Sequence, residues 1–331
     1  MTMKQLLTTI LLLTLALGTQ AAGKYDNPDT IVVARDGTGE FRTIGEAIEV
    51  CRAFMGYHKV IFVKKGLYKE KLIVPQWLQN IEICGEDRDE TIITWDDHAN
   101  IKILLPSSQG GGEMKPMSTF RTYTLRIEGN DITLKNITIE NNAAKLGQAV
   151  ALHTMGDRLT FVNCRFLGNQ DTIYTGVEAT RLYFTDCYIE GTTDFIFGPS
   201  TAWFEKCRIL CKADSYITAA STPEKQLYGY IFNNCTITCA TGVKKVYLGR
   251  PWRDYGYTLF MHCQLPAQIC PEGWHHWEKQ REQTARYMEF ENTGEGAATD
   301  KRVTWSRQLT KKEAKEITLE NVFSRADSWM K

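Results

Sequence analysis

The sequence predicts an all-β fold, a single-domain parallel β-helix, on the basis of three observations. A Cys followed seven residues later by an Asp recurs at an interval of 23 positions, at Cys164 and Asp171 and again at Cys187 and Asp194. Short segments with alternating apolar residues recur around this repeat. No helix pattern of ten or more residues, as a βαβ fold would need, interrupts residues 132–265. A repeat of about this length is typical of stacked coils, each of which buries its apolar face against its neighbour.

Residues 1–22 have the organisation of a secretory signal peptide. Lys4 supplies a basic start, residues 6–18 form the apolar run LLTTILLLTLALG, and the small residues Ala21 and Ala22 follow. Cleavage after them leaves a domain of residues 23–331 that is secreted or periplasmic and not attached to a membrane. An uncleaved membrane anchor is the alternative, although the apolar run is short for a membrane span.

The predicted elements begin with a strand over residues 30–37 and a helix that starts at Thr43. Thr43 and Glu46 form a capping box for this helix, which we expect to run to about Phe54 and to cover the exposed end of the core. Residues 59–74 predict two strands around Gly66.

Two further strands are expected in residues 80–95, followed by a glycine-rich loop over residues 106–118. Near the end of the chain, Thr310 and Glu313 form a second capping box. It opens a helix over residues 309–326, which we expect to pack outside the coils.

The central coils align on one inward-facing position, which recurs at uneven intervals of 27, 23, 20, 28 and 28 and is occupied by Ile137, Cys164, Cys187, Cys207, Cys235 and Cys263. Such uneven spacing places the variation in the turns, which are therefore the expected functional surface. Ten cysteines in a secreted protein normally suggest disulfides, but a series in one register is better interpreted as a ladder of small core side chains. Cys187 and Cys207, in adjacent coils joined by a short connection, are the pair that could still form a disulfide.

The charge balance argues against partners that need a strongly basic surface. The chain has 39 Lys and Arg against 39 Asp and Glu, and removal of Lys4 with the leader leaves 38 against 39. We therefore expect no nucleic-acid binding and no attraction to an anionic membrane. Aromatic residues make up 11% of the chain, with eight Trp, which is enough for a sugar-stacking surface beyond the core.

The two aspartates of the repeat are expected to be neighbours, because equivalent residues of adjacent coils lie about 4.8 Å apart. Two carboxylates this close cannot both ionise freely, so one is held in the protonated form that acid/base chemistry needs. Gln148 joins Asp171 and Asp194 in one stack if the extra residues of the longer coil before Cys164 fall at 141–144. Arg250 precedes a ladder cysteine by the same number of positions as Asp194 does, and could hold one Asp ionised.

Each of these residues alone is more often structural, so the shared register carries the argument. A glutamine above two carboxylates is suited to donate to an oxyanion. Asp214 also follows a ladder cysteine by seven residues, but the next interval breaks the register, so we interpret it as structural.

Four segments that contain these residues closely resemble signature segments of the pectin methylesterase family: GQAVAL, GNQDTIYT, GTTDFIFG and YLGRPW. Weaker resemblances in residues 66–72, 215–222 and 285–297 extend the match over nearly all of the chain after the leader. The resemblance implies a right-handed parallel β-helix and the hydrolysis of methyl esters of homogalacturonan to pectate and methanol.

The resemblance also assigns roles to individual residues. Asp194 matches the nucleophile that attacks the C6 ester carbonyl, and Asp171 matches the general acid and base. Gln148 and Gln170 match the donors to the oxyanion, and Arg250 matches the residue that hydrogen-bonds the nucleophile.

Three aromatic residues, Tyr174, Phe197 and Trp252, match the sugar-binding wall of the family. We expect a monomer that acts on homogalacturonan polymers or oligomers and needs no cofactor and no metal ion.

Three alternatives use the same architecture. A pectate lyase would need Ca²⁺, and Arg250 beside Asp171 and Asp194 argues against a cation there. The two aspartates could instead hydrolyse glycosidic bonds, as paired carboxylates do. A non-catalytic glycan-binding module is favoured only if one of the five catalytic groups is missing.

Overall fold

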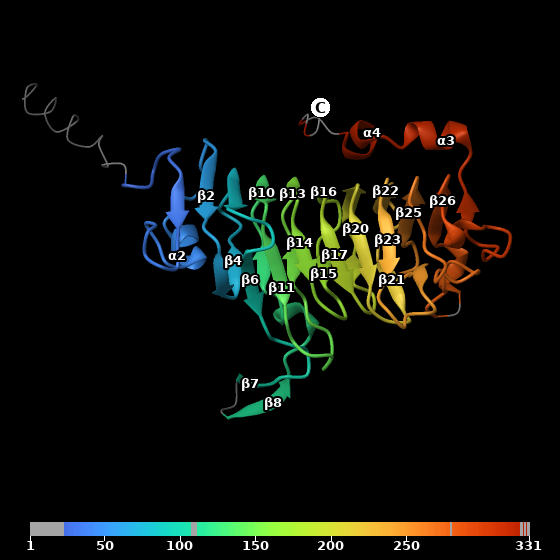
Figure 1. The fold of residues 1–331 in the computed structure, drawn as a ribbon, viewed down its shortest axis with the longest axis horizontal. Coiled ribbons are helices and arrows are strands. Elements are labelled where there is room, and N and C mark those ends of the chain that lie inside the picture. Colours follow the sequence, from blue (N-terminus) through green and yellow to red (C-terminus); the bar gives the residue numbers. More distant parts are fainter. Residues whose placement is uncertain (1–22, 107–110, 279, 325–326, 328, 330–331) are drawn as a thin grey trace, which may run out of the picture.

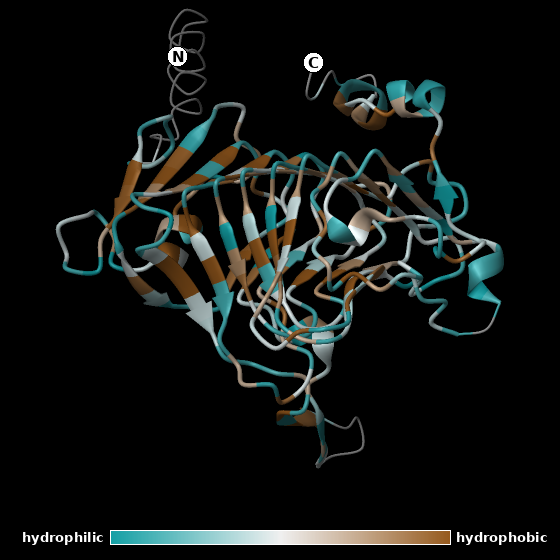
Figure 2. Cartoon of the chain, turned by 45° about the vertical axis from the view of Figure 1, so that its right-hand side comes forward, coloured by the Kyte–Doolittle hydropathy of each residue, from teal (hydrophilic) through white to brown (hydrophobic). Residues whose placement is uncertain are grey.

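The computed structural model describes residues 23–106, 111–278, 280–324, 327 and 329, so the predicted signal peptide lies outside the described residues. The described strands form a stack of coils in which three sheets are entirely parallel, as predicted. Figure 1 shows the coils following one another along the long axis of the molecule. Figure 2 shows apolar residues gathered on the strands and hydrophilic residues in many of the turns.

Sheet A is the longest and contains, in spatial order, β1 (Ile31–Val33), β2 (Lys59–Val63), β5 (Ile81–Gly85), β10 (Ile132–Lys135), β13 (Leu159–Val162), β16 (Arg181–Thr185), β19 (Thr201–Glu205), β22 (Tyr230–Asn233), β25 (Tyr257–Met261), β26 (Arg286–Phe290) and β27 (Arg307–Gln308). Sheet B contains β3 (Gly66–Lys69), β6 (Thr91–Trp95), β11 (Thr138–Asn141), β14 (Arg165–Leu167), β17 (Tyr188–Gly191), β20 (Arg208–Cys211) and β23 (Thr236–Cys239). Sheet C contains β4 (Leu72–Val74), β9 (Leu125–Ile127), β12 (Leu152–Thr154), β15 (Ile173–Thr175), β18 (Ile196–Gly198), β21 (Tyr216–Ala220) and β24 (Tyr247–Gly249).

The register of sheet A confirms the predicted coil lengths. From β10 to β25, paired residues of successive strands are 27, 23, 20, 28 and 28 positions apart, the intervals of the cysteine ladder. The sequence pattern did not extend to β26, which pairs with β25 at an interval of 29.

Each central coil turns at a residue in the left-handed backbone conformation, directly before the ladder position. These residues have φ between 49° and 55° and are Asn136, Asn163, Asp186, Lys206, Asn234 and His262. Asn and Asp tolerate this conformation better than most residues, which explains why they supply four of the six turns.

The ladder cysteines are core residues, and all ten cysteines of the described chain are free thiols. Each ladder thiol donates to a backbone carbonyl of the preceding coil, for example Cys187 Sγ to Phe161 O at 3.4 Å and Cys207 Sγ to Phe184 O at 3.7 Å. Both Cys187 and Cys207 are free, so the disulfide that the sequence left possible between them is not formed.

Several predicted elements differ from the structure in their bounds. The N-terminal helix α2 (Ile44–Glu49) has the predicted capping box and contacts strands of the first coil, but it ends at its cap, Val50, before Phe54. Residues 59–74 form three strands instead of two, since both β3 and β4 follow β2.

The predicted glycine-rich loop contains part of an antiparallel hairpin, β7 (Lys102–Pro106) and β8 (Gly112–Pro116), which projects from the stack in Figure 1. The pattern of the segment gave no strand signal because the hairpin is largely exposed and has no buried face. The described connections also contain three short 3₁₀ helices: η1 (Thr119–Arg121), η2 (Arg281–Gln283) and η3 (Glu295–Ala297).

The predicted C-terminal helix is divided into α3 (Lys311–Glu316) and α4 (Leu319–Phe323). The capping box of Thr310 and Glu313 is present, but Thr318 caps a second helix and breaks the first. As predicted, the pair lies outside the coils, where Val322 and Phe323 pack with apolar residues on the outer face of sheet A. No helix of the described chain is long and apolar enough to cross a membrane.

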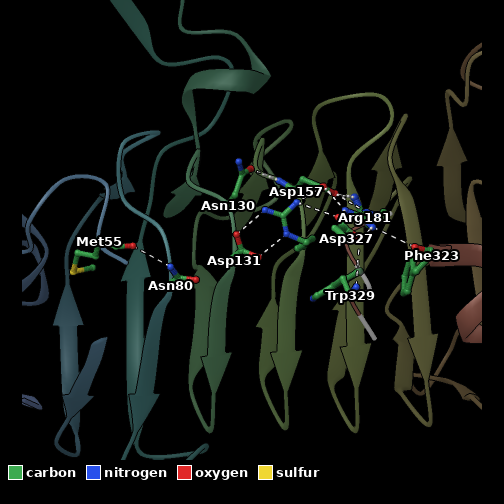
Figure 3. Close-up of polar contacts among 10 residues, drawn as sticks. Met55, Asn80, Asn130, Asp131, Asp157, Arg181, Phe323, Asp327 and Trp329 are labelled. Atoms are coloured by element: carbon green, nitrogen blue, oxygen red, sulfur yellow. Dashed lines mark hydrogen bonds and ion pairs between the residues drawn. The ribbon is translucent and has the colours of Figure 1, made fainter. Parts of the chain in front are cut away.

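A buried arginine connects the C-terminal segment to sheet A (Figure 3). The guanidinium of Arg181, whose side chain is 2% exposed, binds Asp157 at 2.7 Å and also binds Asp327 and the carbonyl oxygen of Phe323. Burial alone would raise the pKa of Asp157, but the hydrogen bonds from Arg181 outweigh it and lower that pKa. The same hydrogen bonding holds the pKa of Asp327 below its usual value.

We expect Arg181→Leu to lower the free energy of unfolding by about 3 kcal/mol at neutral pH, because it removes the main partner of the partly buried Asp157 carboxylate. Depressed carboxyl pKa values contribute stability above their unfolded values, so the difference from wild type should shrink as pH falls below about 4. Denaturant titrations at several pH values measure this effect. Arg158→Leu is the matched control, since Arg158 also binds Asp157 but is 25% exposed, and it should cost less. Equal losses would contradict the special role of Arg181.

Candidate active site

Two aspartates lie side by side on adjacent coils, as the repeat predicted. Ile173 of β15 pairs with Ile196 of β18, and Asp171 and Asp194 lie two residues before these positions. The backbone N–H of Asp194 donates to Tyr216 O at 2.9 Å. Both aspartates have a positive φ, 66° and 48°, and are buried, with 8% and 5% of their surface exposed. Both carboxyl groups line the same pocket.

Arg250 binds the Asp194 carboxylate through two hydrogen bonds. Nε donates to Oδ1 at 3.0 Å and a terminal guanidinium nitrogen donates to Oδ2 at 2.6 Å. This fork arrangement fixes the carboxylate in orientation as well as in charge. Among the described contacts, no hydrogen bond to the carboxylate of Asp171 is found, so the arginine distinguishes the two acids.

The route by which Arg250 reaches Asp194 differs from the prediction. The register of β21 and β24 places Tyr216 and Tyr247 in the column of the two aspartates, at the position expected for Arg250. Arg250 belongs instead to the column three positions farther along the strands, in which Phe197 pairs with Ala219 and the register of β21 and β24 places Arg250 opposite Ala219. Ala219, whose side chain is only a methyl group, lines the same pocket as Arg250 and Asp194.

The prediction that Gln148 stacks on Asp171 and Asp194 in one register was wrong, although Gln148 and Gln170 both line the site. Leu152 pairs with Ile173 at an interval of 21, whereas β11 and β14 pair at an interval of 27. Six residues, and not four, are therefore inserted before β12, so Gln148 does not lie opposite Asp171. The N–H of Ala149 donates to Gln170 O at 3.0 Å, so Gln148 lies beside Gln170 and both side chains line the pocket.

The pocket has a volume of about 270 Å³ and is lined by all five predicted polar residues, by Phe197 and Trp252, and by residues that the sequence did not indicate, Thr119, Phe120 and Trp277. A larger hollow of about 460 Å³ lies beside α4 but does not contain such a group of convergent carboxylates, so volume alone does not locate the site. Tyr174 stacks on Phe197 with ring centroids 4.7 Å apart and extends the aromatic wall.

The two carboxyl groups differ in electrostatics. Burial, and then the charge of Asp194, raise the pKa of Asp171 well above its ordinary value, and Arg250 opposes this only through its charge. Burial also raises the pKa of Asp194, but there both the hydrogen bonds and the charge of Arg250 counteract it. Asp171 is therefore the acid that retains a proton more readily, and Asp194 is the one that carries the negative charge.

His153 is a further residue of the aromatic wall that the sequence did not indicate. It is buried beside Tyr174, with ring centroids 4.7 Å apart, and pairs with Arg126 of β9. Burial and the charge of Arg126 lower the pKa of His153 to about 4, so the imidazole is neutral near pH 7. In the part of the chain that the structure describes, no group of three or more acidic, His or Cys side chains is placed to hold a metal ion.

A parallel β-helix whose pocket combines paired buried aspartates, an arginine and an aromatic wall defines a carbohydrate-active enzyme. Comparison with known proteins specifies which kind. The profile of the pectinesterase family matches residues 30–326, and the chain belongs to this family, whose members hydrolyse the methyl esters of pectin.

Individual relatives agree with this assignment. Pectinesterase 31 of Arabidopsis thaliana is 37% identical over 285 residues, which cover 85% of this chain and 88% of the relative. The pectinesterase of Petunia integrifolia is 33% identical, with 90% and 80% of the two chains covered. Some relatives are longer: the chain covers only 46% of probable pectinesterase/pectinesterase inhibitor 21 of A. thaliana, at 35% identity.

Solved structures give the same result. Carrot pectin methylesterase superimposes with a TM-score of 0.80 at 32% identity, over 89% of this chain and 93% of the carrot enzyme. The Erwinia chrysanthemi enzyme superimposes with a TM-score of 0.73 at 28% identity, over 89% and 97% of the two chains.

We expect Ala219→Leu to reduce ester hydrolysis at least tenfold, because a larger side chain at this position would intrude into the pocket in which Arg250 binds Asp194. Overpacking of this kind also costs about 1–3 kcal/mol of stability, so the protein should remain folded at room temperature. Initial rates of methanol release, together with circular dichroism, measure both effects. Ala219→Ser is the control and should retain most activity. A fully active Ala219→Leu variant would show that this space in the pocket is not needed.

Proposed function

We propose that the protein hydrolyses the C6 methyl esters of homogalacturonan through a covalent acyl-enzyme on Asp194, with Asp171 as general acid and then general base. The observation that carries this proposal is the unequal treatment of two adjacent buried carboxyl groups, since Arg250 binds only one of them. Membership of the pectinesterase family supports the reaction and its substrate.

In the first step, a carboxylate oxygen of Asp194 attacks the ester carbonyl carbon of a galacturonate unit. Arg250 holds the carboxylate ionised and oriented, which a weak nucleophile needs. As the tetrahedral intermediate collapses, the bond to methoxide breaks and Asp171 gives its proton to the departing oxygen, so that methanol leaves.

In the second step, water attacks the acyl-enzyme. Asp171, now ionised, takes a proton from the attacking water, and the bond between the acyl carbon and Asp194 breaks. The products are a free galacturonate carboxyl group and the original Asp194 carboxylate, and Asp171 is protonated again. Both aspartates are thereby returned to their starting states.

The remaining pocket residues support the intermediate and the substrate. The side-chain amides of Gln148 and Gln170 line the pocket and are suited to donate hydrogen bonds to the oxyanion in both steps. Tyr174, Phe197 and Trp252 supply ring faces against which sugar units of the polymer, or of an oligomer, can pack. A solved pectin methylesterase at 28% identity was crystallised in complex with a hexasaccharide, which is consistent with this type of cleft.

The alternatives predicted from the sequence are less well supported. A lyase would need a cation bound between carboxylates, and Arg250 occupies both oxygens of Asp194. Cleavage of glycosidic bonds would require the pair to flank a sugar–sugar bond as acid and nucleophile. The polar groups required for ester hydrolysis are all present, so a purely binding role is not favoured.

We further propose that residues 1–22 are a signal peptide and that residues 23–331 act as a single-domain monomer outside the cytoplasm, in the periplasm or the medium. Intact mass of the exported protein should correspond to a chain that begins near Gly23, and sedimentation should give one monomeric species. An exported protein that retains residues 1–22 would contradict cleavage.

Asp194→Ala should abolish methanol release from highly methylated pectin while leaving the circular dichroism spectrum unchanged, because it removes the nucleophile and not a core residue. The wild-type protein should release methanol without added metal. Unsaturated products absorbing in the ultraviolet, or chain shortening without methanol, would point to a lyase or a glycosidase. Retention of most activity by Asp194→Ala would refute the assignment of the nucleophile.

The dependence of kcat/KM on pH should be bell-shaped. Activity requires ionised Asp194, so it falls as pH decreases through the pKa of that residue, and it requires protonated Asp171, so it falls as pH rises through the elevated pKa of Asp171. Arg250→Met should move the acid limb to higher pH, because both hydrogen bonds to Asp194 are lost. An unshifted acid limb would show that it reports a different group.

A further inference from the structure

The guanidinium of Arg250 lies between two aromatic rings. Its central carbon is 4.0 Å from the centroid of the Tyr216 ring and 3.8 Å from the centroid of the Trp277 ring. Both distances are well within the range of a cation–π contact. Arg250 thus has aromatic rings close on two sides, while its N–H edge binds Asp194.

Tyr216 is held in place by its neighbours in sheet C. It is the first residue of β21, and its ring stacks on that of Tyr247 with centroids 5.4 Å apart and an interplanar angle of 19°. His275 packs against the rings of both Tyr216 and Tyr247, at 5.4 Å and 5.5 Å. Tyr216 therefore presents a fixed surface to Arg250.

Trp277 is held by an unusual backbone conformation. Its φ of 64° lies in the left-handed region, which bulky residues rarely adopt and which is enriched at functional sites. The backbone N–H of Trp277 donates to His275 Nδ1 at 3.2 Å. Farther along the same loop, Arg281 donates to the carbonyl oxygens of Pro251 and Trp252 at 3.2 Å and 2.9 Å. The loop is thereby fastened to the segment that carries Arg250.

We propose that Tyr216 and Trp277 are positioning residues for the reaction, which act by confining Arg250 in the orientation that binds Asp194. The two rings restrict rotation of the guanidinium and keep water from its faces. Exclusion of water strengthens the attraction between its charge and the Asp194 carboxylate. The inference rests on the proposed role of Asp194 as nucleophile, and it extends the site to two residues that the sequence analysis did not single out.

Trp277→Leu tests the proposal through kcat, KM and the pH profile of methanol release. We expect kcat to fall about tenfold, which lies between the effects expected for an exposed and for a fully desolvated cation–π contact, since the Arg250 side chain is 21% exposed. The acid limb should also move to higher pH, because a less confined Arg250 stabilises ionised Asp194 less well. Tyr216→Leu should act in the same direction. Trp277→Phe and Tyr216→Phe retain a ring face and should restore most of kcat and the wild-type acid limb.

Trp252→Leu is the matched control, because it removes an indole from the same pocket. Trp252 belongs to the aromatic wall, and among the contacts of the described residues its ring does not pack against Arg250. It should raise KM and leave the acid limb where it is. If Trp277→Leu gives the same result as Trp252→Leu, Trp277 only binds sugar and the proposal is wrong. Asp194→Asn in the same series distinguishes a failure of this proposal from a failure of the proposed function. If Asp194→Asn keeps activity, Asp194 is not the nucleophile.

Discussion

The in-register stacking of coils is the constraint on which the rest of the structure depends. Phenylalanines three residues before the ladder cysteines form a continuous column, with centroids of successive rings 4.3–4.6 Å apart and interplanar angles of 7–15°: Phe161, Phe184, Phe204, Phe232 and Phe260. Rings at this spacing leave little freedom for one coil to slip along the next. The same register, carried around the coil to sheet C, is what places Asp171 beside Asp194.

The fold and the aspartate pair could be predicted because the two coils concerned have equal lengths. One and the same interval separates the two ladder cysteines, the paired strands of sheet A and the two aspartates. Where a turn contains an insertion, spacing in one sheet no longer fixes position in another. Gln148 follows such an insertion and Arg250 belongs to a different column, so counting from the ladder put both in the wrong register.

The parts of the site that the sequence did not indicate lie in connections outside the paired strands, where the register of the coils does not determine position. Phe120 lies in η1, beyond the exposed hairpin, and Trp277 lies in a loop whose shape depends on a left-handed backbone and on contacts of His275 and Arg281. A periodic pattern contains no information on such contacts. The division of the C-terminal helix has a similar origin, since Thr318 competes locally for the backbone N–H groups.

The difference between the two aspartates also arises outside the repeat. Equivalent residues of a regular stack have similar backbones, and both aspartates are buried with a positive φ, so the coil itself gives them similar chemistry. What separates them is one side chain from two coils beyond Asp194. Arg250 binds Asp194 from the column that also contains Ala219, and two aromatic rings pack against its guanidinium. A repeating scaffold therefore supplies the proximity of two acids, and non-repeating residues around Arg250 decide which of them carries the charge.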